Sequence, residues 1–295
     1  MASSRTHGLP ADLPRSLVEG LDVRSAARVH GGDIAASYRL DTARGPLFLK
    51  THPQPKPDMF EREAVGLRLL RASAGPELGV PRVLRQDARG LVLEWIDAAP
   101  GRPSAATEEA LGRGLAGLHR STHPTYGAID DALAGYLGSA EIDLTPTTDW
   151  PEFFVQRRLS PLVERAIGLG RLDPAARRLL DRCAPRAAEL CGPAEPPALV
   201  HGDLWAGNRM VDREGENWLI DPACHWGHRE LDLAMMQLFG GFGQGCFAAY
   251  DEAFPLGAGW RERTPWYQLP PLLVHAILFG GGYGDAALAA LARYA

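Results

Sequence analysis

Residues 1–97 alternate short apolar runs with turn residues, which is the pattern of a small antiparallel sheet. Turns at 41–45 and 87–90 would join neighbouring strands as hairpins. Between these turns, the segment 59–72 repeats apolar side chains at the spacing of one helix face. We therefore expect one helix at 59–72 and five β-strands, at residues 23–29, 36–40, 46–51, 80–86 and 91–96.

A helical pattern replaces this one after AAPGRP at 98–103, because proline and glycine break regular structure. Thr107 begins a segment in which Leu111, Leu115 and Leu118 recur at helical spacing. Further helices are expected at 149–169, 173–191, 229–240, 244–254 and 266–281, and short β-segments at 198–201, 209–211 and 218–220. The sequence thus predicts an α+β protein with a β-rich lobe at 1–97, a larger and mainly helical lobe at 98–295, and a ligand cleft between them.

Composition limits the classes of protein to which the chain can belong. Its 295 residues are 45% hydrophobic, which is enough for two lobes with their own cores. The net charge is −5 and basic residues form no block, so we expect no nucleic-acid partner. No segment approaches the roughly 18 apolar residues of a membrane span, and the N-terminus lacks the apolar core of a signal peptide. Four cysteines without a C-x-x-C pair favour a reducing, cytoplasmic setting: Cys183, Cys191, Cys224 and Cys246.

The strongest chemical signal is the segment LVHGDLWAGNRMVDREGENWLIDPA, residues 199–223. His201, Asp203 and Asn208 form the pattern H-x-D-x-x-x-x-N, and Asp221 ends a later apolar run. Phosphoryl transfer requires an oriented acceptor hydroxyl and neutralised phosphate charge. The Asp203 carboxylate suits the first task, while Asn208 and Asp221 offer the oxygen ligands that Mg²⁺ prefers. A lone Asp or Asn is usually a turn former or a helix cap, but this ordered set favours phosphoryl transfer from ATP.

A basic residue in the N-terminal part complements these acids. The β-like run LFLK ends at Lys50, whose ammonium could reach nucleotide phosphates. Further along, Glu63 falls in the predicted helix, where its carboxylate could fix Lys50 as an ion pair. Glu61 is the competing partner, and only one of the two can serve because their side chains point to different faces of the helix. We expect Glu63 to do so.

Weaker signals mark the rest of a nucleotide site. Gly31 and Gly32 stand between two β-like stretches, where backbone amides could approach phosphate, although an ordinary hairpin explains them equally well. The run LVLEWI at 91–96 reaches the predicted lobe boundary, so backbone groups of Glu94 and Ile96 could pair with adenine. A plain apolar strand would give the same run, and only its location favours the functional interpretation.

Aromatic and metal-binding residue types also occur near the acids. Trp205 lies close to Asp203, where its indole could stack on a sugar or an amine, or could simply fill the core. Cys224, His225 and His228 resemble part of a metal cluster, but no second Cys/His pair completes a zinc pattern. Polar groups that line the cleft are the preferred interpretation of these three.

These segments resemble the fructosamine/ketosamine kinase family, whose fold is protein-kinase-like and related to that of aminoglycoside phosphotransferases. The resemblance rests on HGDLWAGN and DPACHWGHRELDLAMMQLFGGF, and extends to GGDIAASYRL, LFLK, FEREAVGLRLL, LAGLHR and WPEFFVQRRLSPL. It implies a two-lobed kinase that uses ATP and Mg²⁺. The substrate implied is a free or protein-linked ketosamine, phosphorylated at its sugar 3-hydroxyl, and the role implied is deglycation.

The resemblance also implies roles for the residues of the two acidic motifs. By position, Asp203 matches the catalytic Asp, and Asn208 and Asp221 match the metal ligands. Lys50 and Glu63 match the pair that positions the nucleotide.

Residues around the catalytic loop receive supporting roles from the same resemblance. Asp232, in ELDLA, matches an acid that braces this loop together with His201, although a charge at a helix start explains it too. Trp205, His228 and Glu230 fall in the family-specific part and are therefore the candidates for substrate contacts.

The chain departs from the family pattern at two places. Residues 33–36 read Asp-Ile-Ala-Ala where relatives often carry Ser or Cys followed by Ile-Asn, so this turn is expected to contact nucleotide through its backbone alone. Ile277 and Leu278 make the segment 275–283 more apolar than is usual. These departures concern the identity of the acceptor more than the type of reaction. The first alternative is a kinase of another hydroxylated amine, such as an aminoglycoside or an amino alcohol. The second alternative is a non-catalytic nucleotide-binding pseudokinase.

Overall fold

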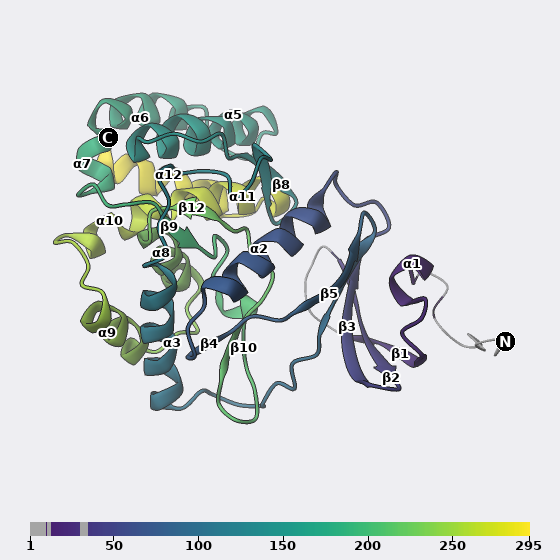
Figure 1. Ribbon diagram of the computed structural model, residues 1–295. Coiled ribbons are helices and arrows are strands. Elements are labelled where there is room, and N and C mark those ends of the chain that lie inside the picture. Colours follow the sequence, from purple (N-terminus) through teal and green to yellow (C-terminus); the bar gives the residue numbers. More distant parts are fainter. Residues whose placement is uncertain (1–9, 11–12, 30–34) are drawn as a thin grey trace.

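Five antiparallel strands form the sheet in the N-terminal part of the computed structural model, which describes residues 10, 13–29 and 35–295 (Figure 1). Their order in the sheet is β1 (Val23–Val29), β2 (Ala36–Thr42), β3 (Gly45–Thr51), β6 (Gly90–Glu94) and β5 (Val83–Asp87). The pairing of Thr42 with Gly45 closes the β2–β3 hairpin. All five predicted strands are confirmed, although β5 begins at Val83 rather than at Val80.

Apolar clusters cover both faces of this sheet. Successive side chains of a strand point to opposite faces, so neighbouring apolar residues pack in different clusters. On one face lies α2 (Met59–Ser73), which confirms the predicted helix. Leu91 of β6 belongs to its apolar cluster, whereas the next residue, Val92, packs in a second cluster with Leu17 of α1 (Arg15–Val18). The buried face of α2 is the predicted one: Phe60, Ala64, Leu67 and Leu70.

Most of the remaining chain is helical, as predicted. The helices are α3 (Ala105–Leu118), α4 (Trp150–Glu152), a π-helical segment (Phe153–Leu159), α5 (Ser160–Gly168), α6 (Ala175–Cys183), α7 (Ala187–Cys191), α8 (Glu230–Phe239) and α9 (Gln244–Ala253). Ser104, not Thr107, marks the start of α3, because its hydroxyl accepts a hydrogen bond from the Thr107 amide and caps the helix.

The C-terminal helices differ from the prediction. Two helices, α10 (Trp260–Tyr267) and α11 (Leu269–Phe279), replace the single helix expected at 266–281. Pro270 and Pro271 lie in the first turn of α11, where their missing amide donors are tolerated, but they cannot continue the hydrogen bonds of α10. The last helix, α12 (Tyr283–Tyr294), was not predicted, and it packs beside α11 (Figure 1).

Short strands bring the two acidic segments together. β9 (Ala198–Val200) pairs with β12 (His225–Gly227), and β10 (Arg209–Val211) pairs with β11 (Asn217–Leu219). The His201 Nε2 donates a hydrogen bond to the Ile220 carbonyl at 2.9 Å. The loops that follow β9 and β11 therefore begin next to each other. β4 (Leu78–Gly79) extends the second pair in parallel to β11, and the hairpin of β7 (Ala134–Leu137) and β8 (Ala140–Asp143) was not predicted.

The segment 95–104 connects the sheet to α3. Its Ala99 amide donates to the Val211 carbonyl at 2.8 Å, which attaches the connection to β10. The division of the chain at 97/98 stays a prediction. None of the helices within residues 10, 13–29 and 35–295 is long and apolar enough to cross a membrane.

Candidate active site

The loop after β9 is held from behind by Asp232, in the first turn of α8. The Asp232 carboxylate is fully buried and accepts hydrogen bonds from the backbone amides of His201, at 2.7 Å, and Gly202, at 2.8 Å. The His119 imidazole lies 3.2 Å from the same carboxylate. Burial by itself would raise the pKa of Asp232, but the hydrogen bonds and charges of its partners outweigh it and lower the pKa. Asp232 is therefore ionised, and its two hydrogen bonds hold the start of the loop.

Gly202 has no substitute at this bend. Its φ of +82° lies in the left-handed region, and a Cβ atom there would stand 2.2 Å from the Ala223 carbonyl oxygen. The two acidic loops can thus approach each other only because residue 202 has no side chain.

Asp203, Asn208 and Asp221 come together where these loops meet. The Asn208 Nδ2 donates to the Asp203 carbonyl at 2.8 Å and to the Asp203 Oδ2 at 3.2 Å. The Asp221 carbonyl lies 3.4 Å from the same nitrogen. Because the amide nitrogen is directed at Asp203 and Asp221, the Asn208 Oδ1 is the atom that this side chain can offer to a cation.

Lys50 joins the N-terminal sheet to these acids. Its Nζ lies 3.0 Å from the Asp221 Oδ1, and 3.1 and 3.0 Å from the two carboxylate oxygens of Glu63 on α2. Glu61 points elsewhere, with a half-exposed side chain beside Arg62. The expected Lys50–Glu63 ion pair is therefore present, and Glu61 is not part of it.

The charges of this cluster are unbalanced. Burial, reinforced by the Asp221 carboxylate, raises the pKa of Asp203 to about 7. Burial also raises the pKa of Glu63 to about 7, against the opposing effect of the Lys50 ammonium. For Lys50 itself burial acts to lower the pKa, but Asp221 and Glu63 raise it above its ordinary value. Three carboxylates around one ammonium form a site that a further cation would stabilise.

A cavity of about 530 Å³ opens beside these residues. This volume is in the range of small-molecule sites, roughly 300–1,000 Å³. Lys50, Glu63, Asp203, Asn208 and Asp221 all line it. Trp205 lines it too, with 39% of its surface exposed, which places the indole where a substrate contact was expected.

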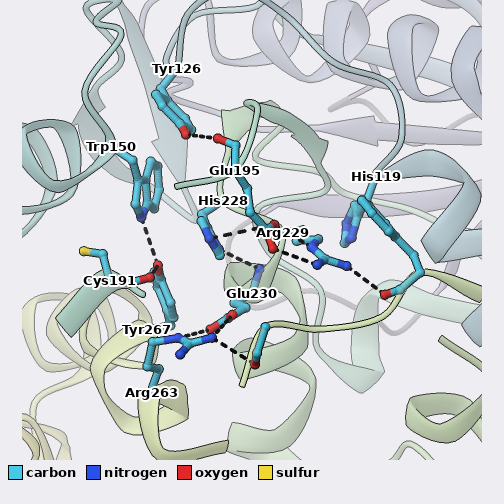
Figure 2. Close-up of polar contacts among 12 residues, drawn as sticks. His119, Tyr126, Trp150, Cys191, Glu195, His228, Arg229, Glu230, Arg263 and Tyr267 are labelled. Carbon is cyan, nitrogen blue, oxygen red and sulfur yellow. Dashed lines mark hydrogen bonds and ion pairs between the residues drawn. The ribbon is translucent and has the colours of Figure 1, made fainter. Parts of the chain in front are cut away.

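Two residues expected to contact substrate lie elsewhere. His228 and Glu230 are 1% and 2% exposed, and neither lines the cavity. His228 stacks on Tyr267 with ring centroids 5.2 Å apart, and Glu230 forms a bidentate ion pair with Arg263 at 2.9 and 2.6 Å (Figure 2). The structure thus corrects the expectation for both: they belong to a buried polar network. Their place in the family-specific part of the sequence did not bring them to the cavity, because both side chains are buried in the core around the start of α8.

The other described residues predicted to contact the nucleotide, Glu94 and Ile96, are not among those that line the cavity. Glu94 ends β6, and its amide donates to the Arg82 carbonyl at 3.0 Å. Ile96 is buried just beyond, and its carbonyl accepts from the Ala98 amide at 3.1 Å. Adenine contacts at these two residues stay a prediction. Gly31 and Gly32 lie outside the described residues.

Several cavity residues gave no signal in the sequence. Arg62, next to Glu63 on α2, donates to Asp130 at 2.6 Å and so connects the helix to the loop before β7. The lining also includes aromatic residues of α8, α11 and α12. Leu278 lines the cavity as expected for an apolar wall, but Ile277 is buried behind it. These residues have ordinary types and spacing, so only their position in the fold distinguishes them.

Comparisons with known proteins agree with this geometry. A sequence model of the fructosamine kinase family matches residues 11–295. An Enterococcus faecium protein assigned as a ketoamine kinase is 37% identical over 260 residues, which cover 87% of this chain and 90% of that protein. A chloroplastic protein-ribulosamine 3-kinase of Oryza sativa subsp. indica is 31% identical over 283 residues, covering 92% and 79%.

Solved structures point the same way. The crystal structure of a Thermobifida fusca protein assigned as a fructosamine-3-kinase superimposes with a TM-score of 0.86 at 38% identity, covering 95% of this chain and 96% of that one. A macrolide 2′-phosphotransferase from Brachybacterium faecium has a TM-score of 0.61 at 19% identity, covering 92% and 94%, and shares the fold. The predicted fold class, α+β and kinase-like, is confirmed.

Proposed function

The chain belongs to the fructosamine kinase family, and we propose that it transfers the γ-phosphoryl group of ATP to the 3-hydroxyl of a ketosamine, a sugar joined to an amine. One observation carries this proposal. Lys50 and Asp221, far apart in the sequence, stand 3.0 Å apart at the cavity that also contains Asp203 and Asn208. A nucleotide-binding module without catalysis has no physical need for all four groups.

Asp203 is the residue that acts on the acceptor. Its Oδ2 receives a hydrogen bond from Asn208, which leaves the other oxygen to orient the substrate hydroxyl and accept its proton. The hydroxyl oxygen forms a bond to the γ-phosphorus as the bond to ADP breaks, and the proton passes to the carboxylate. A pKa raised to about 7 suits a group that takes up this proton near neutral pH.

Lys50, held by Glu63, binds the phosphate oxygens of the nucleotide. Asn208 and Asp221 would hold Mg²⁺, which when bound neutralises the charge of the triphosphate. The donor set fits this ion, because a carboxylate and an amide oxygen are the hard oxygen ligands that Mg²⁺ prefers. Two oxygen ligands that share the coordination sphere with phosphates and water are what Mg²⁺ commonly accepts.

The acceptor is a ketosamine because of the family and its relatives. The Oryza sativa relative is a protein-ribulosamine kinase, so both fructose- and ribulose-derived adducts are substrates to compare. Phosphorylation at the 3-hydroxyl would make the adduct labile and release the amine, which gives the enzyme a deglycation role.

The test is a phosphorylation assay with MgATP and a panel of acceptors: a fructosamine, a ribulosamine, an aminoglycoside and an amino alcohol. We expect product, located by ³¹P NMR on the 3-hydroxyl, with the ketosamines only.

Asp203→Ala should lower kcat by roughly 10²- to 10⁴-fold while MgATP still binds. Asp221→Ala should weaken MgATP binding as well, because it removes a metal ligand. The exposed Asp181→Ala on α6 is the control and should change neither quantity. Unchanged turnover of Asp203→Ala would refute the assignment, and a preference for another acceptor would replace the substrate.

A further inference from the structure

Five aromatic side chains form one side of the cavity that contains Asp203; we call them the aromatic wall. They extend from the catalytic loop through the end of α8 to α11 and the start of α12. Each ring lies next to another member of the wall. The ring centroids are 6.3 Å apart for Trp205 and Phe239 and 4.9 Å apart for Phe239 and His275. The His275 ring lies 5.5 Å from that of Phe279 and 5.1 Å from that of Tyr283. The members are Trp205, Phe239, His275, Phe279 and Tyr283.

The wall is open to solvent. Trp205, Phe239 and Phe279 are 39%, 37% and 50% exposed, and within residues 10, 13–29 and 35–295 they are the only exposed large aromatic side chains. Exposed aromatic surface costs solvation free energy, and its concentration in one cavity marks a place where a ligand covers it.

The wall also carries no charge. The His275 Nδ1 donates to the Pro271 carbonyl at 2.7 Å, and burial lowers the pKa of this imidazole, so it is neutral near pH 7. The cations among the described lining residues, Lys50 and Arg62, both have carboxylate partners, Asp221 at 3.0 Å and Asp130 at 2.6 Å. An anionic substituent on the substrate would therefore find no cation here that is not already paired.

We propose that the aromatic wall binds the amine substituent of the ketosamine and selects substituents that are apolar and, above all, aromatic. This inference rests on the proposed function. Lys50 and Asp221 define the side of the cavity that holds the triphosphate, and Asp203 fixes the reacting hydroxyl. Trp205 follows Asp203 closely in the chain and begins the wall, so the part of the substrate remote from ATP lies against the rings. An aromatic substituent stacks on them, and the protonated amine lies on an indole or phenyl face.

The first measurement compares kcat/KM for three fructose adducts that differ only in the amine: benzylamine, methylamine and glycine. We expect the benzylamine adduct to exceed the methylamine adduct by roughly 10-fold or more, because a whole ring is buried against the wall. The glycine adduct should be the poorest of the three, because its carboxylate meets no unpaired cation among the described lining residues.

Variants then locate the effect. Phe279→Ala should lower the benzylamine-to-methylamine ratio by roughly 3- to 10-fold, the contribution of one aromatic contact. Phe279→Tyr keeps the ring and should keep the ratio. Leu169→Ala removes an equally exposed apolar side chain outside the cavity and should leave both adducts unchanged. The ratio is measured within each variant, so a loss common to both substrates cancels.

The possible failures are distinct. If the parent enzyme phosphorylates all three adducts equally, prefers the glycine adduct, or keeps its ratio in Phe279→Ala, the wall does not select the amine and the proposed function stands. If no ketosamine is phosphorylated at all, the proposed function itself is wrong.

Discussion

Replacing Asp232 by Asn tests how the catalytic loop is held. Two explanations exist for this acid: a brace for the loop, or a charge that favours the start of α8. In the structure its two oxygens accept from the amides of His201 and Gly202 and face His119. An Asn side chain keeps the shape but has one acceptor, and its NH₂ group must face one of the backbone amides.

The magnitude follows from these contacts. Loss of a charged hydrogen bond, with a buried amide left unpaired, costs about 3 kcal/mol. Unfolding entropy scales as roughly 2.1 cal/mol/K per residue, or about 0.6 kcal/mol/K for 295 residues, so Tm should fall by about 5 °C. The loop that carries Asp203 would also move, and a displacement near 1 Å costs about 10²-fold in rate. We expect kcat to fall by roughly 10- to 100-fold with little change in the KM for MgATP.

Asp285→Asn is the matched control, because Asp285 occupies the same position in the first turn of α12 but is exposed. It removes a helix-start charge and nothing else, so its effect should stay below about 1 kcal/mol. Thermal denaturation followed by circular dichroism and steady-state kinetics give both quantities. If Asp232→Asn lowers Tm no more than Asp285→Asn and retains its kcat, the brace does not exist.

Two further predictions concern Glu63 and His228. Glu63→Gln should raise the KM for MgATP and lower kcat, so that kcat/KM falls by roughly 10-fold or more, because Lys50 loses one of its two anionic partners. Glu61→Gln is the control. The Glu61 side chain is half-exposed on another face of the helix, so this change should alter neither constant. Burial, helped by the charges of Arg229 and Arg263 and opposed by that of Glu195, lowers the pKa of His228 to about 4. Only the unfolded chain therefore takes up this proton as pH falls from about 6.5 towards 4, and stability declines by up to about 1.4 kcal/mol per pH unit. Denaturant titrations at several pH values measure how the free energy of unfolding changes with pH. His228→Phe should make this free energy less dependent on pH between 6.5 and 5, while the KM for the ketosamine stays unchanged. An unchanged pH dependence or a raised KM would contradict the buried, structural role.

The secondary structure near the sheet and the acidic motifs could be predicted because their signals are local. The apolar spacing of α2 determined both the helix and its buried face. The hairpins followed from turn residues between β-like runs. The buried residues of the last helix, Gly284, Ala287 and Leu291, do recur at helical spacing, but two of the three are small, so the apolar signal is weak and packing against α11 stabilises the helix. The β7–β8 hairpin could not be predicted, because its two short strands mix small, apolar and acidic residues. The split between α10 and α11 had a local signal, Pro270 and Pro271, whose position decides where the second helix begins.

The sequence by itself determined the chemistry: an ammonium, two carboxylates and an amide of the types that phosphoryl transfer requires, each at the end of a recognisable local element. Only the tertiary structure decided which neighbours share the cavity with them. It placed His228 and Glu230 in the core and brought Phe239, Phe279 and Tyr283 to the lining of the cavity that contains Asp203. The physical reason is that backbone hydrogen bonds and side-chain periodicity act within a few residues, whereas a cavity wall is built from helices far apart in sequence, whose relative positions depend on apolar burial summed over the whole fold.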